Sequence, residues 1–374
     1  MTSSPDAPPA PRGRRVYIDW ARGIAVLVMI EAHTLDAWTR AAERSTPVFR
    51  DAQILGGFAA PLFLWLAGVG VVLSAARTAE RCGSRGASVD TICRRGLEIF
   101  LLAFLFRLQS FLLSPGTPPA FLFRVDILNV MGPMIVAAGL IWGLPAAARS
   151  TWRLVIAYAA VAAAIALLTP IVRASAAVNA LPIWFQWYVR PAGDYTVFTL
   201  FPWAGFIFAG GACGVLLAAA SGREAEQRLH RWLGPTGLAL IAAGLFAATL
   251  PSLYRQSSFW TTSPAYFAIR VGVMMAVLAA AHAAAGVLER AGIALPMLER
   301  LGRNSLFVYW IHVELVYGYA SWLWRGRLPL WGTAIAFALF SALMYQAIQW
   351  RDDVVSAWRG RRGPIGQAPQ AVTA

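Results

Sequence analysis

The most informative stretch of the sequence is an apolar segment that carries an acid and an imidazole. Residues 22–33 read RGIAVLVMIEAH, so Glu31 and His33 interrupt a run that could otherwise cross a membrane. A charged side chain at the bilayer centre costs roughly 2.5–3.5 kcal/mol, so polar groups at this depth usually face the bundle interior or water. Glu31 and His33 are therefore candidate catalytic residues, and His33 is suited to act as a base near neutral pH.

The polar residues of this first apolar segment fall mainly on one stripe of a helix, formed by Asp19, Arg22, His33 and Asp36. Arg22 and His33 are separated by about 16 Å along the helix axis, so a cation lies near one membrane face and a base lies deeper. Glu31 lies about 180° from Arg22 and must face another neighbour. We expect Asp19, Arg22 and Asp36 to bind substrate. The structural alternatives are a charge pair at the helix start and an interhelical hydrogen bond from His33.

A second apolar segment repeats the combination of a histidine and a nearby acid. Residues 301–318 read LGRNSLFVYWIHVELVYG, with His312 in the middle and Glu314 two positions on. His312 is thus the third candidate catalytic residue. The remaining candidates for contact with substrate are Ser305, Tyr309, Arg124 and Asp126.

The composition is that of a polytopic membrane protein. Of the 374 residues, 58% are hydrophobic and only 13% are charged, whereas soluble domains have about 25% charged residues. Apolar runs long enough to cross a bilayer recur along the whole chain. The sequence therefore predicts an all-α bundle of roughly ten transmembrane helices, near residues 17–37, 54–76, 97–113, 126–145, 154–171, 197–219, 234–251, 264–286, 305–320 and 329–349.

The arginines indicate how the bundle is oriented. All 32 basic residues are Arg, and cytosolic N- and C-termini would place 21 of them on the cytosolic side and 8 outside. The net charge of +14 then reflects topology, and no nucleic-acid partner is expected. Abundant Ala and Arg without Lys suggests a GC-rich bacterial genome, and hence the bacterial cytoplasmic (inner) membrane. The three cysteines lack metal-ligand spacing, and no metal site is predicted.

The sequence predicts three parts: a Pro-rich disordered cytosolic tail at 1–15, one transmembrane domain at 16–350, and a basic cytosolic tail at 351–374. Two long outer loops are expected at 38–53 and 172–196. His230 lies in an arginine-rich stretch that we place in a cytosolic loop, where its ring would be solvated.

Four short segments resemble a known group of enzymes. YIDWARGIAVLVMIEAH resembles the first span of the transmembrane acyltransferases, with Asp19, Arg22, Gly23 and His33 at the same spacing. APLFLWLAGVG and LGRNSLFVYWIHVELVYG resemble later segments of that superfamily. FRVDILNVMG is similar to the mid-chain motif of the heparan-α-glucosaminide N-acetyltransferase-like branch.

The resemblance implies a membrane-bound acyltransferase. Such enzymes pass an acyl group, often acetyl, from cytosolic acyl-CoA to an amine or hydroxyl of a sugar or glycan beyond the membrane. Acetyl-CoA or another acyl-CoA would be the co-substrate, arginines such as Arg22 would bind its phosphates, and His33 or His312 would be the base. Direct transfer and an acyl-enzyme intermediate both fit, and the sequence leaves open whether the chain forms a homodimer.

Two other functions remain open at this point. A proton-coupled small-molecule transporter could use His33, Glu31, His312 and Glu314 as a proton relay. The sequence shows no inverted repeat, which many transporters carry. A membrane scaffold without catalytic activity, in which the polar groups pair internally, is the third alternative.

Overall fold

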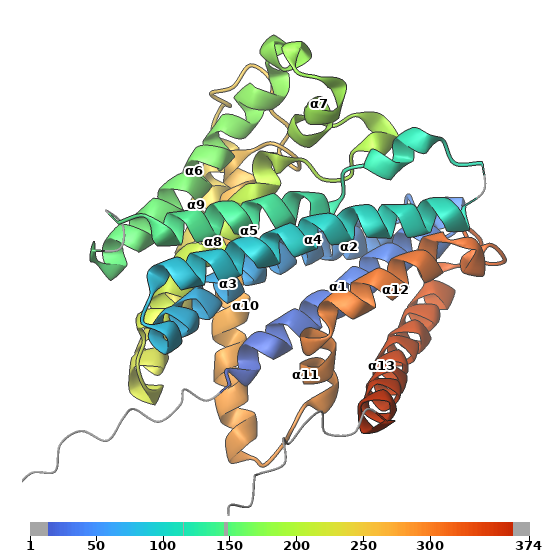
Figure 1. Ribbon diagram of the computed structural model, residues 1–374. Helices are drawn as coiled ribbons and strands as arrows, with labels where there is room; N and C mark the ends of the chain where they lie inside the picture. The colour runs from blue at the N-terminus through green and yellow to red at the C-terminus, as the bar shows by residue number, and fades with distance from the viewer. Residues whose placement is uncertain (1–13, 115, 146–148, 362–374) are drawn as a thin grey trace, which may run out of the picture.

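A computed structural model describes residues 14–114, 116–145 and 149–361, without the side chains of 359–361. This part of the chain is helical and has no strands, which confirms the predicted all-α class. The helices of Figure 1 are α1 (Val16–Trp38), α2 (Pro47–Gly56), α3 (Ala59–Cys82), α4 (Arg85–Leu113), α5 (Ile127–Gly143), α6 (Thr151–Ala174), α7 (Ile183–Val189), α8 (Leu200–Ala219), α9 (Arg223–Thr249), α10 (Pro264–Arg290), α11 (Pro296–Arg303), α12 (Ser305–Tyr317) and α13 (Leu330–Arg361).

Seven helical segments of the described residues are long and apolar enough to cross a membrane, with α2 and α3 counted as one. They coincide with seven of the predicted spans. The other three predicted spans correspond to α1, which is long but carries charges, and to the shorter apolar helices α5 and α12. The chain is therefore an integral membrane protein.

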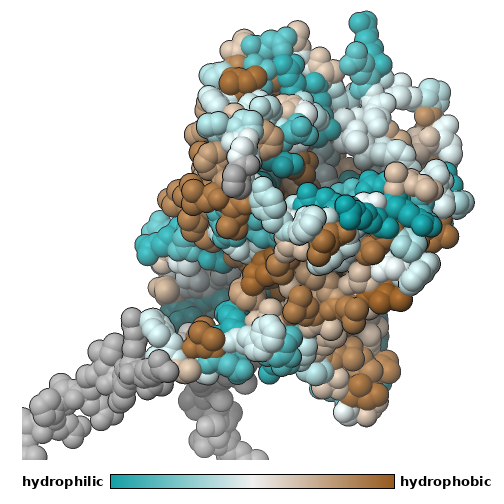
Figure 2. Space-filling view, turned by 90° about the vertical axis from the view of Figure 1, so that its right-hand side faces the viewer, coloured by the Kyte–Doolittle hydropathy of each residue, from teal (hydrophilic) through white to brown (hydrophobic). Residues whose placement is uncertain are grey.

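The outer face of α4 shows why the bundle needs a bilayer. Leu97, Leu101, Leu105, Leu108 and Leu112 recur every three or four residues and are all exposed. Figure 2 shows hydrophobic side chains gathered over a broad part of one face of the molecule, with hydrophilic side chains above them. Apolar surface of this extent is unfavourable in water and indicates contact with lipid.

Helix α1 runs through the interior and positions the polar stripe. It packs against α2, α3, α10, α11, α12 and α13, and it lies beside α12 in Figure 1. Its apolar residues Ala21, Ala25, Val26 and Ile30 have no exposed surface. Because its apolar side is held by neighbours in this way, the polar stripe of α1 is fixed in direction.

Small residues allow α3 and α8 to pack with their backbones in contact. A Cβ atom on Gly68 would overlap the carbonyl oxygen of Ile207, and one on Gly210 would overlap that of Trp65. Close approach of this kind is what small residues permit in membrane bundles. In the second predicted span, at 54–76, Gly68 thus allows close packing of α3 against α8.

Gly210→Ala is expected to destabilise the protein, because its methyl group would force α3 and α8 apart. Overpacking of this type typically costs about 1–3 kcal/mol. Gly286→Ala is the matched control, since nothing lies within 4 Å of a Cβ atom there. Because alanine favours the helix over glycine, this change should raise the free energy of unfolding by about 0.5–1 kcal/mol. Thermal unfolding in detergent measures both, and equal melting temperatures would contradict the close packing.

Two predicted loops contain helices. The sequence predicts an outer loop at 38–53, but α2 begins at Pro47, where the Thr46 side chain accepts a hydrogen bond from the Phe49 amide. An N-cap followed by proline is a helix-start signal. The predicted loop at 172–196 contains the short helix α7.

The arginine-rich stretch around His230 is also helical and not a loop. Helix α9 begins at Arg223, with Glu224 and Glu226 in its first turn, where acidic side chains favour helix formation. His230 is only 6% exposed, so the expectation of a solvated ring was wrong.

At the C-terminal end of the described residues, α13 continues to Arg361, so part of the predicted C-terminal tail is helical. The predicted N-terminal tail lies almost entirely outside the described residues.

Candidate active site

A cavity of about 1190 Å³ lies inside the bundle, lined by residues of α1, α3, α4, α5, α10 and α12. Its lining defines two ends, a basic end with Arg22, Arg94 and Arg95 and a histidine end with His33, Asp36 and Tyr317. Arg22 and Asp36 are about 21 Å apart along α1, compared with about 30 Å for the hydrocarbon core of a bilayer. The cavity therefore spans most of the thickness that a membrane would have here.

The two candidate histidines meet at the histidine end. His33 Nδ1 and His312 Nε2 are 2.8 Å apart, and the rings are stacked with an interplanar angle of 5°. His33 lines the cavity, whereas His312 lies behind it and has no exposed surface. Helices α1 and α12, far apart in sequence, thus supply one paired site.

The hydrogen bonds assign the tautomers of neutral His33 and His312. The carbonyl oxygen of Val308, 2.8 Å from His312 Nδ1, can only accept, so His312 carries its proton on Nδ1. His312 Nε2 then accepts from His33 Nδ1–H. This leaves the lone pair on His33 Nε2, so His33 has a free basic nitrogen and His312 holds it in that tautomer.

Asp36 and Tyr317 complete the histidine end. The Tyr317 hydroxyl donates to Asp36 Oδ2 at 2.9 Å, and its ring contacts the edge of the His33 ring at a centroid distance of 5.5 Å. Asp36 and Tyr317 are both exposed. The histidine end of the cavity therefore has exposed residues at its rim.

Glu31 does not line the cavity, although it is two residues from His33. Its carboxylate is directed toward α2, where a Cβ atom on Gly56 would lie 3.2 Å from Glu31 Oε2. This placement agrees with the helical wheel, on which Glu31 faces away from Arg22. We therefore leave Glu31 out of the reaction proposed below.

Asp19 holds Arg22 at the basic end but does not line the cavity itself. Asp19 is buried, with Arg14 Nε 2.6 Å from Oδ2 and an Arg22 guanidinium nitrogen 3.7 Å from Oδ1. Arg22 reaches into the cavity beside Gly70, where a Cβ atom would lie 2.8 Å from its nitrogen. The expected contact with substrate is therefore geometrically open to Arg22 and not to Asp19.

Asp126 pairs with Arg107 and caps α5. Arg107 Nη2 lies 2.7 Å from Asp126 Oδ2, and both side chains are largely buried. Asp126 Oδ1 accepts from the backbone amides of Leu128 and Asn129. Arg124 also lines the cavity, and burial, together with the Arg107 charge, lowers its pKa. Asp126 therefore has a structural role in addition to its place in the lining.

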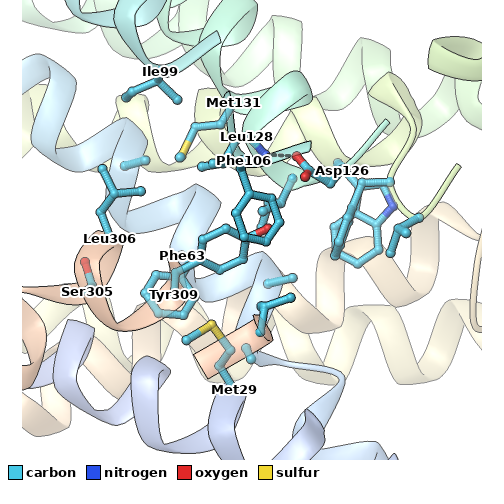
Figure 3. A pocket seen from close by; sticks show the side chains of 18 of the residues that line it. Met29, Phe63, Ile99, Phe106, Asp126, Leu128, Met131, Ser305, Leu306 and Tyr309 are labelled. Carbon is cyan, nitrogen blue, oxygen red and sulfur yellow. Dashed lines mark hydrogen bonds between the residues drawn. The ribbon is translucent and has the colours of Figure 1, made fainter. Parts of the chain in front are cut away.

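The middle of the cavity is apolar. Figure 3 shows Phe63, Phe106, Met131, Leu306 and Met29 around this part, with Ser305 and Tyr309 of α12 on the same wall. The two sequence candidates from α12 thus line the section between the two ends. A long, flexible and mostly uncharged chain could lie in this section.

Arg270 is a lining residue that the sequence analysis did not select. It is 9% exposed, its Nε atom has no hydrogen-bond partner among the described residues, and its guanidinium lies 4.1 Å from the centroid of the Tyr266 ring. The sequence does indicate it, because an arginine within an apolar span is rare and usually marks a functional site.

Together these features define an integral membrane protein with an internal site built around two paired imidazoles. The family model described as heparan-alpha-glucosaminide N-acetyltransferase, catalytic, matches residues 14–244, more than half of the chain, which therefore belongs to this family. The match includes His33 and ends before α10. None of the curated proteins matches the chain. The family makes the protein a membrane acetyltransferase.

Proposed function

We propose that this protein transfers an acyl group, in the simplest case acetyl, from acyl-CoA at the basic end to an amine or hydroxyl of a sugar at the histidine end. The observation that carries the proposal is the His33–His312 pair on a cavity that extends from Arg22 to Asp36. With the cytosolic side at the basic end, as the arginines indicate, donor and acceptor would enter from opposite faces of the membrane.

The basic end suits the phosphates of coenzyme A. Arg22, Arg94 and Arg95 line it, and guanidinium groups form strong charge-assisted hydrogen bonds with phosphate. The apolar middle section would accommodate the uncharged arm of the cofactor. The thioester would then lie near His33.

His33 would act as the base in a direct transfer. Its Nε2 lone pair takes the proton from the acceptor amine or hydroxyl as that group attacks the thioester carbonyl carbon. The carbon–sulfur bond breaks, and the departing thiolate takes the proton from His33. His312 acts through its hydrogen bond, which holds His33 in the reactive tautomer and stabilises the transient imidazolium.

The transporter alternative is less well supported by this geometry. A proton relay through Glu31, His33, His312 and Glu314 needs all four groups along one path. Glu314 lines the cavity, but Glu31 does not. We therefore make acyl transfer the single proposal.

The test is acetyl transfer by purified protein in liposomes. Radiolabelled acetyl-CoA is supplied on one side and an amino sugar on the other, and labelled sugar is the expected product. Labelled protein formed without acceptor would replace direct transfer by an acyl-enzyme route. Movement of unmodified sugar without acetylation would support the transporter.

Arg22→Gln should raise the KM for acetyl-CoA about tenfold or more, because a hydrogen bond to a charged phosphate is worth about 1.5–3 kcal/mol. The value of kcat should change little if Arg22 contacts the phosphates equally in the ground and transition states. Arg77→Gln is the control, since Arg77 is exposed on α3 and does not line the cavity. Steady-state kinetics over a range of acetyl-CoA concentrations measures both, and an unchanged KM for Arg22→Gln would remove Arg22 from the donor site.

A further inference from the structure

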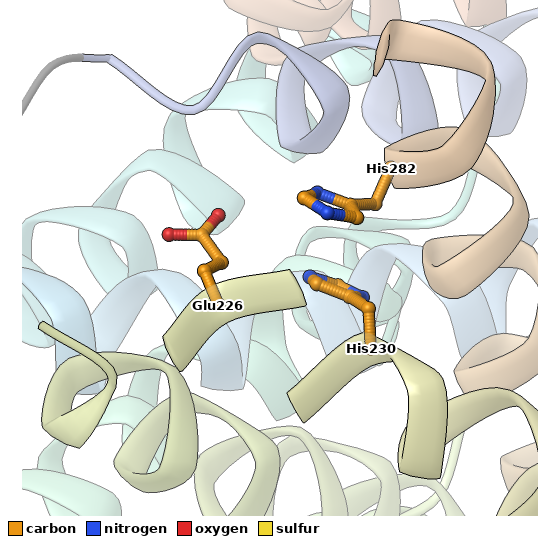
Figure 4. Close-up of side chains that lie close together, drawn as sticks. All are labelled: Glu226, His230 and His282. Atoms are coloured by element: carbon orange, nitrogen blue, oxygen red, sulfur yellow. The ribbon is translucent and has the colours of Figure 1, made fainter. Parts of the chain in front are cut away.

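A second cluster of chemically reactive side chains lies between α9 and α10 and away from the cavity. It consists of Glu226 and His230, one turn apart on α9, and His282 on α10 (Figure 4). One ligand atom from each residue lies within 4.8 Å of the others. None of the three residues lines the cavity, so the proposed acyl transfer gives them no role.

The imidazole of His230 is the unusual member of this cluster. It is 6% exposed, and neither ring nitrogen has a hydrogen-bond partner among the described residues. Buried polar atoms normally have partners, because leaving them unpaired is costly. The ring stacks on His282 with a centroid distance of 4.0 Å and an interplanar angle of 10°. The unpaired ring nitrogens of His230 thus lie beside a second imidazole, an arrangement suited to a cation.

Glu226 is held in place by residues at the start of α1. The Tyr17 hydroxyl donates to Glu226 Oε1 at 2.6 Å, and Arg15 Nε donates to Oε2 at 2.9 Å. Arg15 also donates to the Leu217 carbonyl oxygen at 2.9 Å, so its position does not depend on Glu226 alone. Hydrogen bonds of this kind orient carboxylate ligands in metal sites.

Tyr17 also contacts both imidazoles of the cluster. Its ring meets His230 and His282 edge-on, each at a centroid distance of 5.0 Å. The phenol therefore orients the carboxylate while its ring packs against the two histidines. This leaves the three side chains little freedom to turn away from one another.

We propose that Glu226, His230 and His282 bind a divalent transition-metal ion of the zinc class. Two imidazoles and one carboxylate are a recognised zinc ligand set that leaves a fourth position for water. Zinc lies about 2.0–2.2 Å from such ligands, so each side chain would move inward by less than about 1 Å. Imidazole ligands favour zinc over magnesium or calcium. This proposal departs from the sequence analysis, which predicted no metal.

The charges around the cluster bear on how tightly it would bind zinc. The carboxylate of Glu226 offsets part of the metal charge, whereas the nearby Arg15 guanidinium opposes it. Arg223 is also close in sequence, but its charge is compensated by Glu289 at 2.9 Å. Binding would link α9 to α10, which already pack against each other, and the ligand Glu226 is also held by the start of α1.

The test is metal binding by the full-length protein, purified in detergent through an affinity tag without histidines. After treatment with chelator, zinc is added, excess is removed by dialysis, and bound metal is measured by mass spectrometry. We expect one zinc per chain, a higher melting temperature with zinc, and no such effect of magnesium. Cobalt in place of zinc should give the visible absorption of a tetrahedral site.

Three variants make the test specific. His282→Asn should lose the bound metal, and Tyr17→Phe should weaken binding by about 10–100-fold, as removal of an orienting group does. Glu224→Gln is the matched control, because Glu224 is exposed on the same turn of α9 and lies outside the cluster.

Absence of bound zinc in the wild-type protein overturns the proposal. So does equal zinc content in the wild type and His282→Asn, which would indicate adventitious surface binding. Size-exclusion profiles and melting temperatures without metal verify that each variant is folded.

Discussion

Replacing His33 with alanine is expected to lower the rate of acetyl transfer by about 10²–10⁴-fold, the usual contribution of a positioned general base. The reason is that His33 is the only histidine among the described residues that lines the cavity, whereas His312 lies behind it. The measurement is transfer of labelled acetyl to an amino sugar by protein in liposomes. The loss should appear in kcat more than in the KM for acetyl-CoA, because the basic end is unaffected.

Glu31→Gln is the matched control for this prediction. It changes a polar side chain on the same helix, two residues away, whose carboxylate does not line the cavity. The acyltransferase proposal predicts nearly wild-type activity for Glu31→Gln, whereas a proton relay through Glu31 predicts a large loss. Comparable losses in both variants would contradict the proposed division of roles on α1.

Asp126→Ala is expected to lower the free energy of unfolding by about 3–5 kcal/mol, because it leaves the Arg107 charge buried and unpaired. The Arg107 and Asp126 side chains are only 12% and 3% exposed, and their closest atoms are 2.7 Å apart. The same change removes the cap of α5, since Asp126 Oδ1 accepts from two backbone amides. Unfolding by titration with a denaturing detergent in mixed micelles measures the loss.

Two further variants separate the cap from the ion pair. Asp126→Asn retains an oxygen that can cap α5, so it should be less destabilising than Asp126→Ala. Combining Asp126→Ala with Arg107→Met should recover part of the stability, because the unpaired charge is gone. A loss below about 1 kcal/mol for Asp126→Ala, the size seen for exposed pairs, would contradict this account.

The sequence predicted the helices well because their determinants are local. Hydrophobic runs of span length show where each long helix lies, and this placed seven spans that the structure also has. Local signals also existed for α2, where Thr46 and Pro47 mark a helix start. The error there came from treating a polar stretch outside a span as a loop.

The site could be predicted only in part, since it depends on how distant helices pack. The polar stripe of α1 identified Asp19, Arg22, His33 and Asp36; the last three line the cavity, whereas Asp19 does not. Periodicity within one helix could not show that His312 lies behind His33, or that Asp126 pairs with Arg107 of another helix. For the same reason, the contact of His230 with His282 and Glu226 was missed, because the three residues come together only when α9 packs on α10.

The positive charges along the cavity affect whether ions could leak across the membrane through it. Exposed residues line both ends of this passage, among them Arg95 and Asp36, so a hydrated path could dissipate the ion gradients of the cell. Arg124, just before α5, and Arg270 on α10 line this path, and the Nε atom of each has no hydrogen-bond partner among the described residues. Fixed guanidinium groups repel protons and metal cations, as they do in selective pores. If acyl transfer runs across the membrane as proposed, these charges would keep the passage closed to cations while the two aqueous compartments are joined chemically.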